Sequence, residues 1–125
     1  MMASSLLGLR TVIYKVPELE KAKTWYSKAF ETKPYFDEAF YVGFNIGGYE
    51  LGLDPDGYTG DQNKANAVAY WGTENIQETF DRFIQLGATP VEIPHNVGGE
   101  IMVSTVADPW GNRIGLIYNP EFKLD

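Results

Sequence analysis

The chain has 125 residues, of which 44% are hydrophobic and 14% aromatic, and this composition predicts a folded domain and excludes a disordered chain. Its formal net charge is −7 and it has no run of basic residues, which argues against nucleic acid or an anionic membrane as a partner and mildly favours cationic or neutral ligands. Without cysteine it has no disulfide, thiolate nucleophile or zinc–thiolate site, and without a recognisable signal peptide or membrane span we expect a cytoplasmic protein.

The first half of the chain is predicted to form a strand, a helix and a hairpin. Alternating Val, Ile, Thr and Tyr residues predict a strand over Leu6–Val16. A proline followed by acidic residues predicts a helix start, and apolar residues at three- and four-residue spacing extend this helix over Pro17–Phe30. Two further strands, Phe40–Ile46 and Tyr49–Leu53, are joined by a tight turn at Gly47–Gly48.

A polar segment at about residues 55–66 is interpreted as the linker between two halves of the chain. Its acidic residues Asp56 and Asp61, with the preceding Asp54, raise the question of a calcium loop. The spacing of an EF-hand is not met, because Gly57 falls too early and no Glu closes the loop. A solvated turn is therefore the favoured interpretation.

The second half begins with the same kind of elements as the first. A strand is predicted over Ala67–Gly72, and Asn75 followed three residues later by Glu78 resembles a capping box at the start of a helix. This helix is expected to end at Gly87, which suits a left-handed cap.

The remainder of the second half is predicted to form a final hairpin. Thr89–Ile93 has extended character, and Pro94–Gly99 is interpreted as a loop. The strands Glu100–Ala107 and Asn112–Tyr118 are joined by Asp-Pro-x-Gly-Asn turn chemistry. The tail, Pro120–Asp125, is expected to be loosely held.

The two halves of the chain show the same order of predicted elements and are interpreted as an internal repeat of one module. A shift of 57 positions carries Leu19 to Ile76, and a shift of 65 carries Leu51 to Leu116. We expect a single domain over residues 1–125, with one module at about 6–54 and a second at about 67–119. Each module alone is too small to be stable, so the two are expected to pair and to place any functional site between them.

The segments VPELEKAKTWYSKAF, YELGLD and VADPWGNRIGLI resemble the vicinal oxygen chelate superfamily, which includes glyoxalase I, extradiol dioxygenases and bleomycin-resistance proteins. The resemblance covers nearly the whole chain. It implies an α+β fold in which two βαβββ modules form a half-open, eight-stranded, barrel-like sheet with the helices on the outside. It also implies a ligand in the concave face and a homodimer.

Metal-bearing members of this superfamily carry four ligands, one on the first strand and one on the closing strand of each module. Position by position, the resemblance places them at Thr11, Glu50, Val68 and Gly115, and among these Glu50 alone is a normal metal ligand. The superfamily metal is therefore predicted to be absent, and no cofactor is expected. A displaced metal site would need Glu50, His95 and another acid to converge.

Strand alternation and the expected register select the side chains that can face the concave side. Placing Asn45 opposite Glu50 through the glycine turn also puts Tyr41 on that face. The resulting candidate ligand-binding residues are Ile13, Tyr41, Asn45, Glu50, Val68, Tyr70, Arg113 and Ile117, with Trp110 and the His95 loop at the opening. Apolar walls with a few polar groups are typical of small-molecule sites.

Each candidate also has an ordinary structural interpretation. Glu50 is either a catalytic base or cation partner in the pocket, or a structural salt-bridge partner of Arg113, or solvent-exposed. Trp110 either stacks on a planar ligand or packs on a neighbouring strand, and Tyr41 and Tyr70 either contact the ligand or fill the groove. His95, the single histidine, is more simply a surface residue. Periodicity assigns four aromatic residues to the core, namely Trp25, Trp71, Phe80 and Phe83.

Three functions remain open at this point. The first is a metal-free protein of the bleomycin-resistance type that binds a small, cationic, planar molecule near Glu50. The second is a lyase, isomerase or dioxygenase that uses a displaced metal or Glu50 as base, with Tyr41, Tyr70 or His95 as acid. The third is a non-catalytic scaffold module. Fold resemblance alone does not choose among them.

Overall fold

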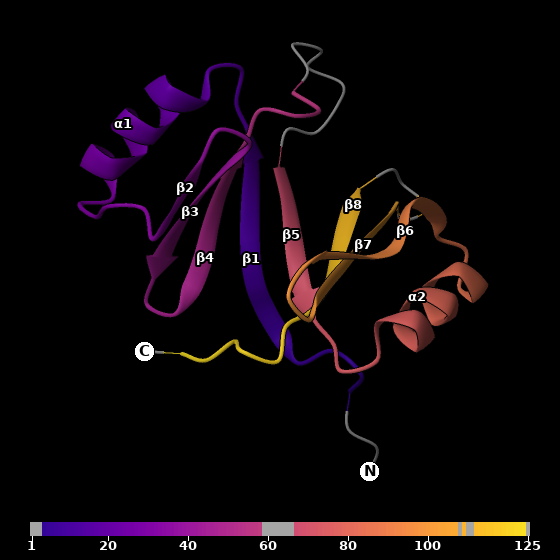
Figure 1. The fold of residues 1–125 in the computed structure, drawn as a ribbon. Coiled ribbons are helices and arrows are strands. Elements are labelled where there is room, and N and C mark those ends of the chain that lie inside the picture. The colour runs from indigo at the N-terminus through magenta and orange to yellow at the C-terminus, as the bar shows by residue number, and fades with distance from the viewer. Residues whose placement is uncertain (1–3, 59–66, 108, 110–111, 125) are drawn as a thin grey trace. The chain divides into compact units, whose positions relative to one another are not determined.

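A computed structural model describes residues 4–58, 67–107, 109 and 112–124, and two helices and eight strands lie in these ranges (Figure 1). In chain order the elements are β1 (Gly8–Lys15), α1 (Leu19–Ala29), β2 (Phe36–Glu38), β3 (Tyr41–Ile46), β4 (Tyr49–Asp54), β5 (Ala67–Gly72), α2 (Ile76–Gln85), β6 (Thr89–Gly98), β7 (Ile101–Ala107) and β8 (Arg113–Tyr118). The order strand, helix, three strands occurs twice, which confirms the predicted α+β fold of βαβββ modules. Neither described helix is long and apolar enough to cross a membrane.

The chain forms two compact units, each built around one helix. The α1 unit contains the described residues of 11–68 together with 123–124, and the α2 unit contains those of 4–10 and 69–122. The division falls inside β1 and inside β5. Most of the predicted linker, residues 59–66, lies outside the described residues, as does Trp110.

The α1 unit is organised by a sheet with the strand order β2-β3-β4-β1. The pairs β2–β3 and β3–β4 are antiparallel, and β1 runs parallel to β4. Alternate residues of β3 and β4 pack with the first helical residue to form the core, which contains Leu19, Val42, Phe44, Leu51 and Leu53. The predicted hairpin turn is confirmed: Gly47 and Gly48 have φ values of 63° and 94°, which a glycine adopts without steric cost.

The N-terminal boundary of α1 and the strand β2 differ from the prediction. The helix begins at Leu19 with Glu18 at the N-cap, so Pro17 precedes the cap and is not the first helical residue. The strand β2 was not expected from the sequence. It has three residues, all exposed, and forms because they pair with β3; a strand this short has no periodic pattern of its own to reveal it.

The α2 unit repeats the arrangement with the strand order β5-β8-β7-β6. Strands β5 and β8 are parallel, whereas β8–β7 and β7–β6 are antiparallel. The buried core of this unit consists of Ile76, Phe80, Val106 and Leu116. The predicted cap is confirmed, because the Asn75 side chain accepts a hydrogen bond of 3.1 Å from the backbone N–H of Glu78.

The loop predicted at Pro94–Gly99 is wrong, because β6 continues to Gly98. In this unit β6 pairs with β7 alone, and its register is irregular at three points between Pro90 and Gly98. A strand with a free edge tolerates proline, since the missing N–H is not needed on its unpaired side. The strand therefore passes through Pro94, and His95 pairs with Val103.

Two of the four aromatic residues assigned to the core are not buried there. Trp25 is 62% exposed and Trp71 is 38% exposed, whereas Phe80 is 7% exposed and Phe83 packs against the α2 core as predicted. Helical spacing placed Trp25 among apolar neighbours, but its ring meets Tyr26 edge-on, with 4.8 Å between ring centroids, on the outer part of α1. A large indole often stays partly exposed even beside a core.

Candidate functional site

Strand alternation on β4 turns Glu50 away from the core of the α1 unit. Its neighbour Leu51 is buried in that core, so Glu50 points from the opposite face. The register places Asn45 on β3 and Thr11 on β1 directly beside it, as the two-residue glycine turn predicts for Asn45. Glu50 thus lies on the sheet face opposite the α1 core, on a strand that is flanked by β3 and β1.

Two phenols donate hydrogen bonds to this carboxylate. The hydroxyl of Tyr35 donates to Oε1 of Glu50, and the hydroxyl of Tyr41 donates to Oε2. Tyr41 was a predicted site residue, whereas Tyr35 was missed because it lies before β2 in a segment without a strand pattern. The segment is fixed by a backbone hydrogen bond of 3.0 Å from the N–H of Tyr35 to the carbonyl of Gly43.

Glycines make room for both phenol rings. Gly43 on β3 pairs with Gly52 on β4, and both lie on the face that carries Glu50. A Cβ at Gly43 would stand 3.2 Å from Cε1 of Tyr35, and a Cβ at Gly52 would stand 2.6 Å from Cζ of Tyr41. Each ring therefore rests on the bare backbone of a glycine and reaches Glu50 from its own side.

The protonation of Tyr35 is tied to this arrangement. Partial burial of the phenol raises the pKa of Tyr35 above its ordinary value and is the largest cause of the shift. The hydrogen bond to Glu50 and the negative charge of that carboxylate raise it further. The phenol therefore stays protonated and remains a donor throughout the physiological range. We call the set Tyr35, Tyr41 and Glu50 the carboxylate–phenol cluster.

In the α2 unit the predicted residue Tyr70 is buried, and its ring covers Gly115 on the neighbouring strand β8. A Cβ at Gly115 would lie 2.5 Å from Cδ2 of Tyr70. Gly115 is the position that the family resemblance assigns to the last metal ligand. In this chain an aromatic ring occupies the space that a ligand side chain at this position would need.

The other predicted residues have different surroundings. Ile117 is buried, two positions beyond Gly115 on the same face of β8, and Arg113 is exposed at the start of that strand. Ile13 pairs with Gly52 in the α1 unit, and Val68 lies at the start of β5. Trp110 lies outside the described residues. The structure thus brings Tyr41, Asn45 and Glu50 together in one unit, whereas Tyr70 and Ile117 lie on neighbouring strands of the other without being paired.

His95 is engaged by its own strand. Its Nδ1 lies 2.8 Å from the carbonyl oxygen of Ile93, and its Nε2 lies 3.7 Å from Oε2 of Glu92. The side chain is 42% exposed. These contacts are those of a surface histidine on an edge strand, which is the simpler of its two interpretations.

The residues present do not fit the superfamily's metal centre. Among the described residues, no group of three or more His, Cys, Asp or Glu side chains is placed to hold a metal ion. Of the four positions given by the resemblance, Val68 and Gly115 have no donor side chain, and the hydroxyl of Thr11 is a poor ligand. Glu50 is the remaining donor, and both of its oxygens accept phenolic hydrogen bonds.

Comparison with known proteins agrees with this fold. Residues 8–116 match a family model described as Glyoxalase/Bleomycin resistance protein/Dioxygenase superfamily. Among solved structures, methylmalonyl-CoA epimerase from Mycobacterium tuberculosis is 17% identical with a TM-score of 0.70, and the match covers 94% of this chain and 92% of that one. No protein with a curated description matches the sequence.

Two further solved structures show the same fold. A glyoxalase/bleomycin resistance protein/dioxygenase superfamily member from Vibrio splendidus 12B01 is 10% identical with a TM-score of 0.66, over 88% of this chain and 97% of that one. The Mn(II)-bound glyoxalase from Novosphingobium aromaticivorans is 14% identical with a TM-score of 0.69, over 93% of this chain and 40% of that longer chain. At such identities the likeness supports the fold and leaves the activity to the site itself.

Proposed function

This chain belongs to the Glyoxalase/Bleomycin resistance protein/Dioxygenase superfamily, and we propose that it is a metal-free binding protein for a small, planar, cationic molecule. The observation that carries the proposal is the carboxylate–phenol cluster, in which Glu50 lies between the hydroxyls of Tyr35 and Tyr41. A carboxylate beside two aromatic rings provides both a counter-charge and π faces for a cation.

The hydrogen bonding of Glu50 favours recognition over proton transfer. Each carboxylate oxygen accepts one phenolic hydrogen bond and keeps a further lone pair that can face a bound cation. A proton taken from a substrate would have to compete with these two donors. A cation, in contrast, adds to the existing hydrogen bonds without displacing them. The net charge of −7 supports the same class of ligand through long-range attraction.

The donor chemistry supports binding without the superfamily's metal. The ring of Tyr70 fills the space over Gly115, and neither Gly115 nor Val68 offers a donor side chain. The polar group of the site is then Glu50 with its phenols, flanked by Asn45. We propose that Ile13 and Val68, which belong to the same unit as Glu50, provide further apolar contacts to the ligand, and that the protein acts as a homodimer.

The test is a comparison of one planar cation with its uncharged counterpart. Binding of 1-methylquinolinium and of quinoline, which is uncharged at pH 8, is measured by isothermal titration calorimetry. We expect the cation to bind more tightly. Replacing Glu50 with Gln should weaken cation binding roughly 10-fold and leave quinoline unaffected, the size of effect expected for one partly desolvated charge partner.

Glu31→Gln is the matched control, because it removes the same charge from an exposed residue of the α1 unit. It should leave the affinity for 1-methylquinolinium within twofold of the wild type, a margin that covers the small effect of one distant screened charge. Equal affinity for the two probes, or equal loss in Glu50→Gln and Glu31→Gln, would contradict the proposal.

A further inference from the structure

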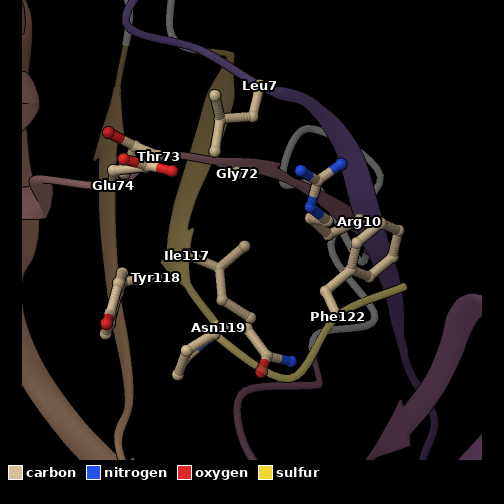
Figure 2. A pocket seen from close by; sticks show the side chains of 10 residues that line it. Leu7, Arg10, Gly72, Thr73, Glu74, Ile117, Tyr118, Asn119 and Phe122 are labelled. Carbon is tan, nitrogen blue, oxygen red and sulfur yellow. The ribbon is translucent and has the colours of Figure 1, made fainter. Parts of the chain in front are cut away.

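A cavity lies entirely within the α2 unit, and none of its lining residues belongs to the carboxylate–phenol cluster. Its volume is about 470 Å³, which is the size of a small-molecule site. The lining comes from the start of the chain, from the end of β5 and the two residues after it, and from the end of β8 with the tail that follows. Figure 2 shows Arg10 and Phe122 together on one side of this cavity, with Thr73 and Glu74 on the other.

The guanidinium of Arg10 is held in place by its two neighbours. Its Cζ lies 3.9 Å from the centroid of the Phe122 ring. On another side it approaches the backbone of Gly72 so closely that a Cβ there would be 2.7 Å from Nε of Arg10. The tail was expected to be loosely held, but Phe122 is anchored by this stacking, and its N–H donates to the carbonyl of Asn119 at 3.3 Å.

Most hydrogen-bond donors of Arg10 remain available. Its one hydrogen bond in the described part of the chain is a long one of 3.4 Å from Nη1 to the carbonyl of Leu9, and the ion pairs found there do not include it. A guanidinium has five N–H donors arranged to meet a carboxylate through two parallel hydrogen bonds. Stacking on Phe122 shields one face from water but leaves the N–H edges open.

The charge and polarity of the lining select the class of anion. Of the ten lining residues, Arg10 is the one base and Glu74 the one acid, so the lining has no net charge to offset a dianion. Leu7, Ile117 and Phe122 add apolar surface beside the guanidinium. From this arrangement we propose that the cavity binds a small monocarboxylate with an apolar body, with the carboxylate on Arg10 and the hydrocarbon against Ile117 and Phe122.

This inference is independent of the proposed cation site. It uses a ligand group of opposite charge and residues of the other unit, so either proposal can fail while the other holds. Glu74 is exposed and lies across the cavity from Arg10, so it disfavours a second negative charge on the ligand. We therefore predict that the cavity binds a monocarboxylate more tightly than a phosphonate dianion.

Three probes with the same phenyl body test the proposal: phenylacetate, uncharged phenylacetamide and dianionic phenylphosphonate. Affinities are measured by calorimetry at pH 8, and the location is read from chemical shifts of the Arg10 Nε–Hε and Ile117 methyl groups. Phenylacetate should bind most tightly. Arg10→Gln should weaken it roughly 10- to 100-fold, the factor expected when charge-assisted hydrogen bonds are lost.

Two further variants separate the position of the Arg10 guanidinium from its charge and provide a control. Gly72→Ala retains the charge of Arg10 but displaces its guanidinium, and the end of a flexible side chain can yield without unfolding the strand. It should therefore weaken phenylacetate binding while the protein stays folded. Arg82→Gln is the matched control, because Arg82 also lies near a phenylalanine ring, 5.3 Å from the centroid of Phe83, but does not line the cavity.

The proposal is overturned if phenylacetate and phenylacetamide bind equally, or if the shifts map outside the cavity. Equal affinity in the wild type and Gly72→Ala, or equal loss in Arg82→Gln and Arg10→Gln, would also overturn it. Tighter binding of phenylphosphonate would show that a dianion site is present and that the assigned ligand class is wrong.

Discussion

Gly43 on β3 lies directly opposite Gly52 on β4, and each of the two glycines lies under the ring of a different tyrosine. The absence of a side chain at both positions creates a shallow space on the sheet. Tyr35 and Tyr41 fill this space and direct their hydroxyls to Glu50. The geometry of the carboxylate is thus set by two residues that have no side chain of their own.

Gly52→Ala should therefore disturb both stability and the site. The added Cβ would overlap Tyr41, whose hydroxyl would leave Glu50, and overpacking of this kind typically costs about 1–3 kcal/mol. Urea unfolding measures the free energy of unfolding. Gly43→Ala is the graded comparison, since its Cβ would be 3.2 Å from Tyr35 and should cost less. An equal or reversed order of the two variants would refute the described ring positions.

The raised pKa of Tyr35 predicts a loss of stability at alkaline pH. A group whose pKa is higher in the folded than in the unfolded protein contributes its full stabilisation at pH values below its unfolded-state pKa, which is about 10 for tyrosine. This stabilisation is lost as the pH rises toward the pKa of the group in the folded protein. Between pH 9 and 11.5 the wild type should lose free energy of unfolding more steeply than Tyr35→Phe.

The comparison with Tyr35→Phe isolates this one phenol. Tyr26 also has a raised pKa, from burial first, and it is present in both proteins. Glu50→Gln should lower the pKa of Tyr35 in a spectrophotometric titration, because it removes the negative charge that opposes formation of tyrosinate. Parallel pH profiles for wild type and Tyr35→Phe would show that Tyr35 does not carry the effect.

Gly115→Glu restores a ligand-type residue at the position implied by the family resemblance, yet it should not create a metal site. The new side chain meets the ring of Tyr70, so we expect a loss of about 1–3 kcal/mol of stability from overpacking. Combining it with Tyr70→Ala should recover part of the clash energy, measured as a non-additive double-mutant cycle. Full additivity would mean that the two side chains do not compete for this space.

Metal content gives the sharpest choice between the binding protein and the enzyme. Elemental analysis of the protein as purified should find far less than one Fe, Mn, Ni or Zn per chain, because the donor set around Glu50 is too poor to hold one. Titration with these metals should not raise the thermal midpoint at micromolar concentration. Stoichiometric metal, or a saturating stabilisation, would favour the lyase, isomerase or dioxygenase alternative.

The sequence predicted the cap at Asn75, the turn at Gly47–Gly48 and the face that Glu50 and Asn45 share. Each depends on residues within a few positions, so local chemistry and a two-residue period are sufficient. The partner Tyr35 lies 15 positions from Glu50 in a segment without a pattern, and no local rule connects them. The conformation of Pro94 was wrongly predicted for the same reason, since a strand with a free edge accepts a proline that local rules assign to a loop.

By itself, then, the sequence determined the repeated order of strands and helices, because hydrophobic period and turn residues act over a few positions. It also determined the donor types at the four metal positions, since a valine or glycine offers no ligand wherever it lies. Tertiary structure alone decided that Tyr35 joins Tyr41 at Glu50, and that Arg10 stacks on Phe122. These contacts join segments that local sequence rules do not connect. They form because the paired strands place glycines, which have no side chain, next to the tyrosine rings and next to the guanidinium of Arg10.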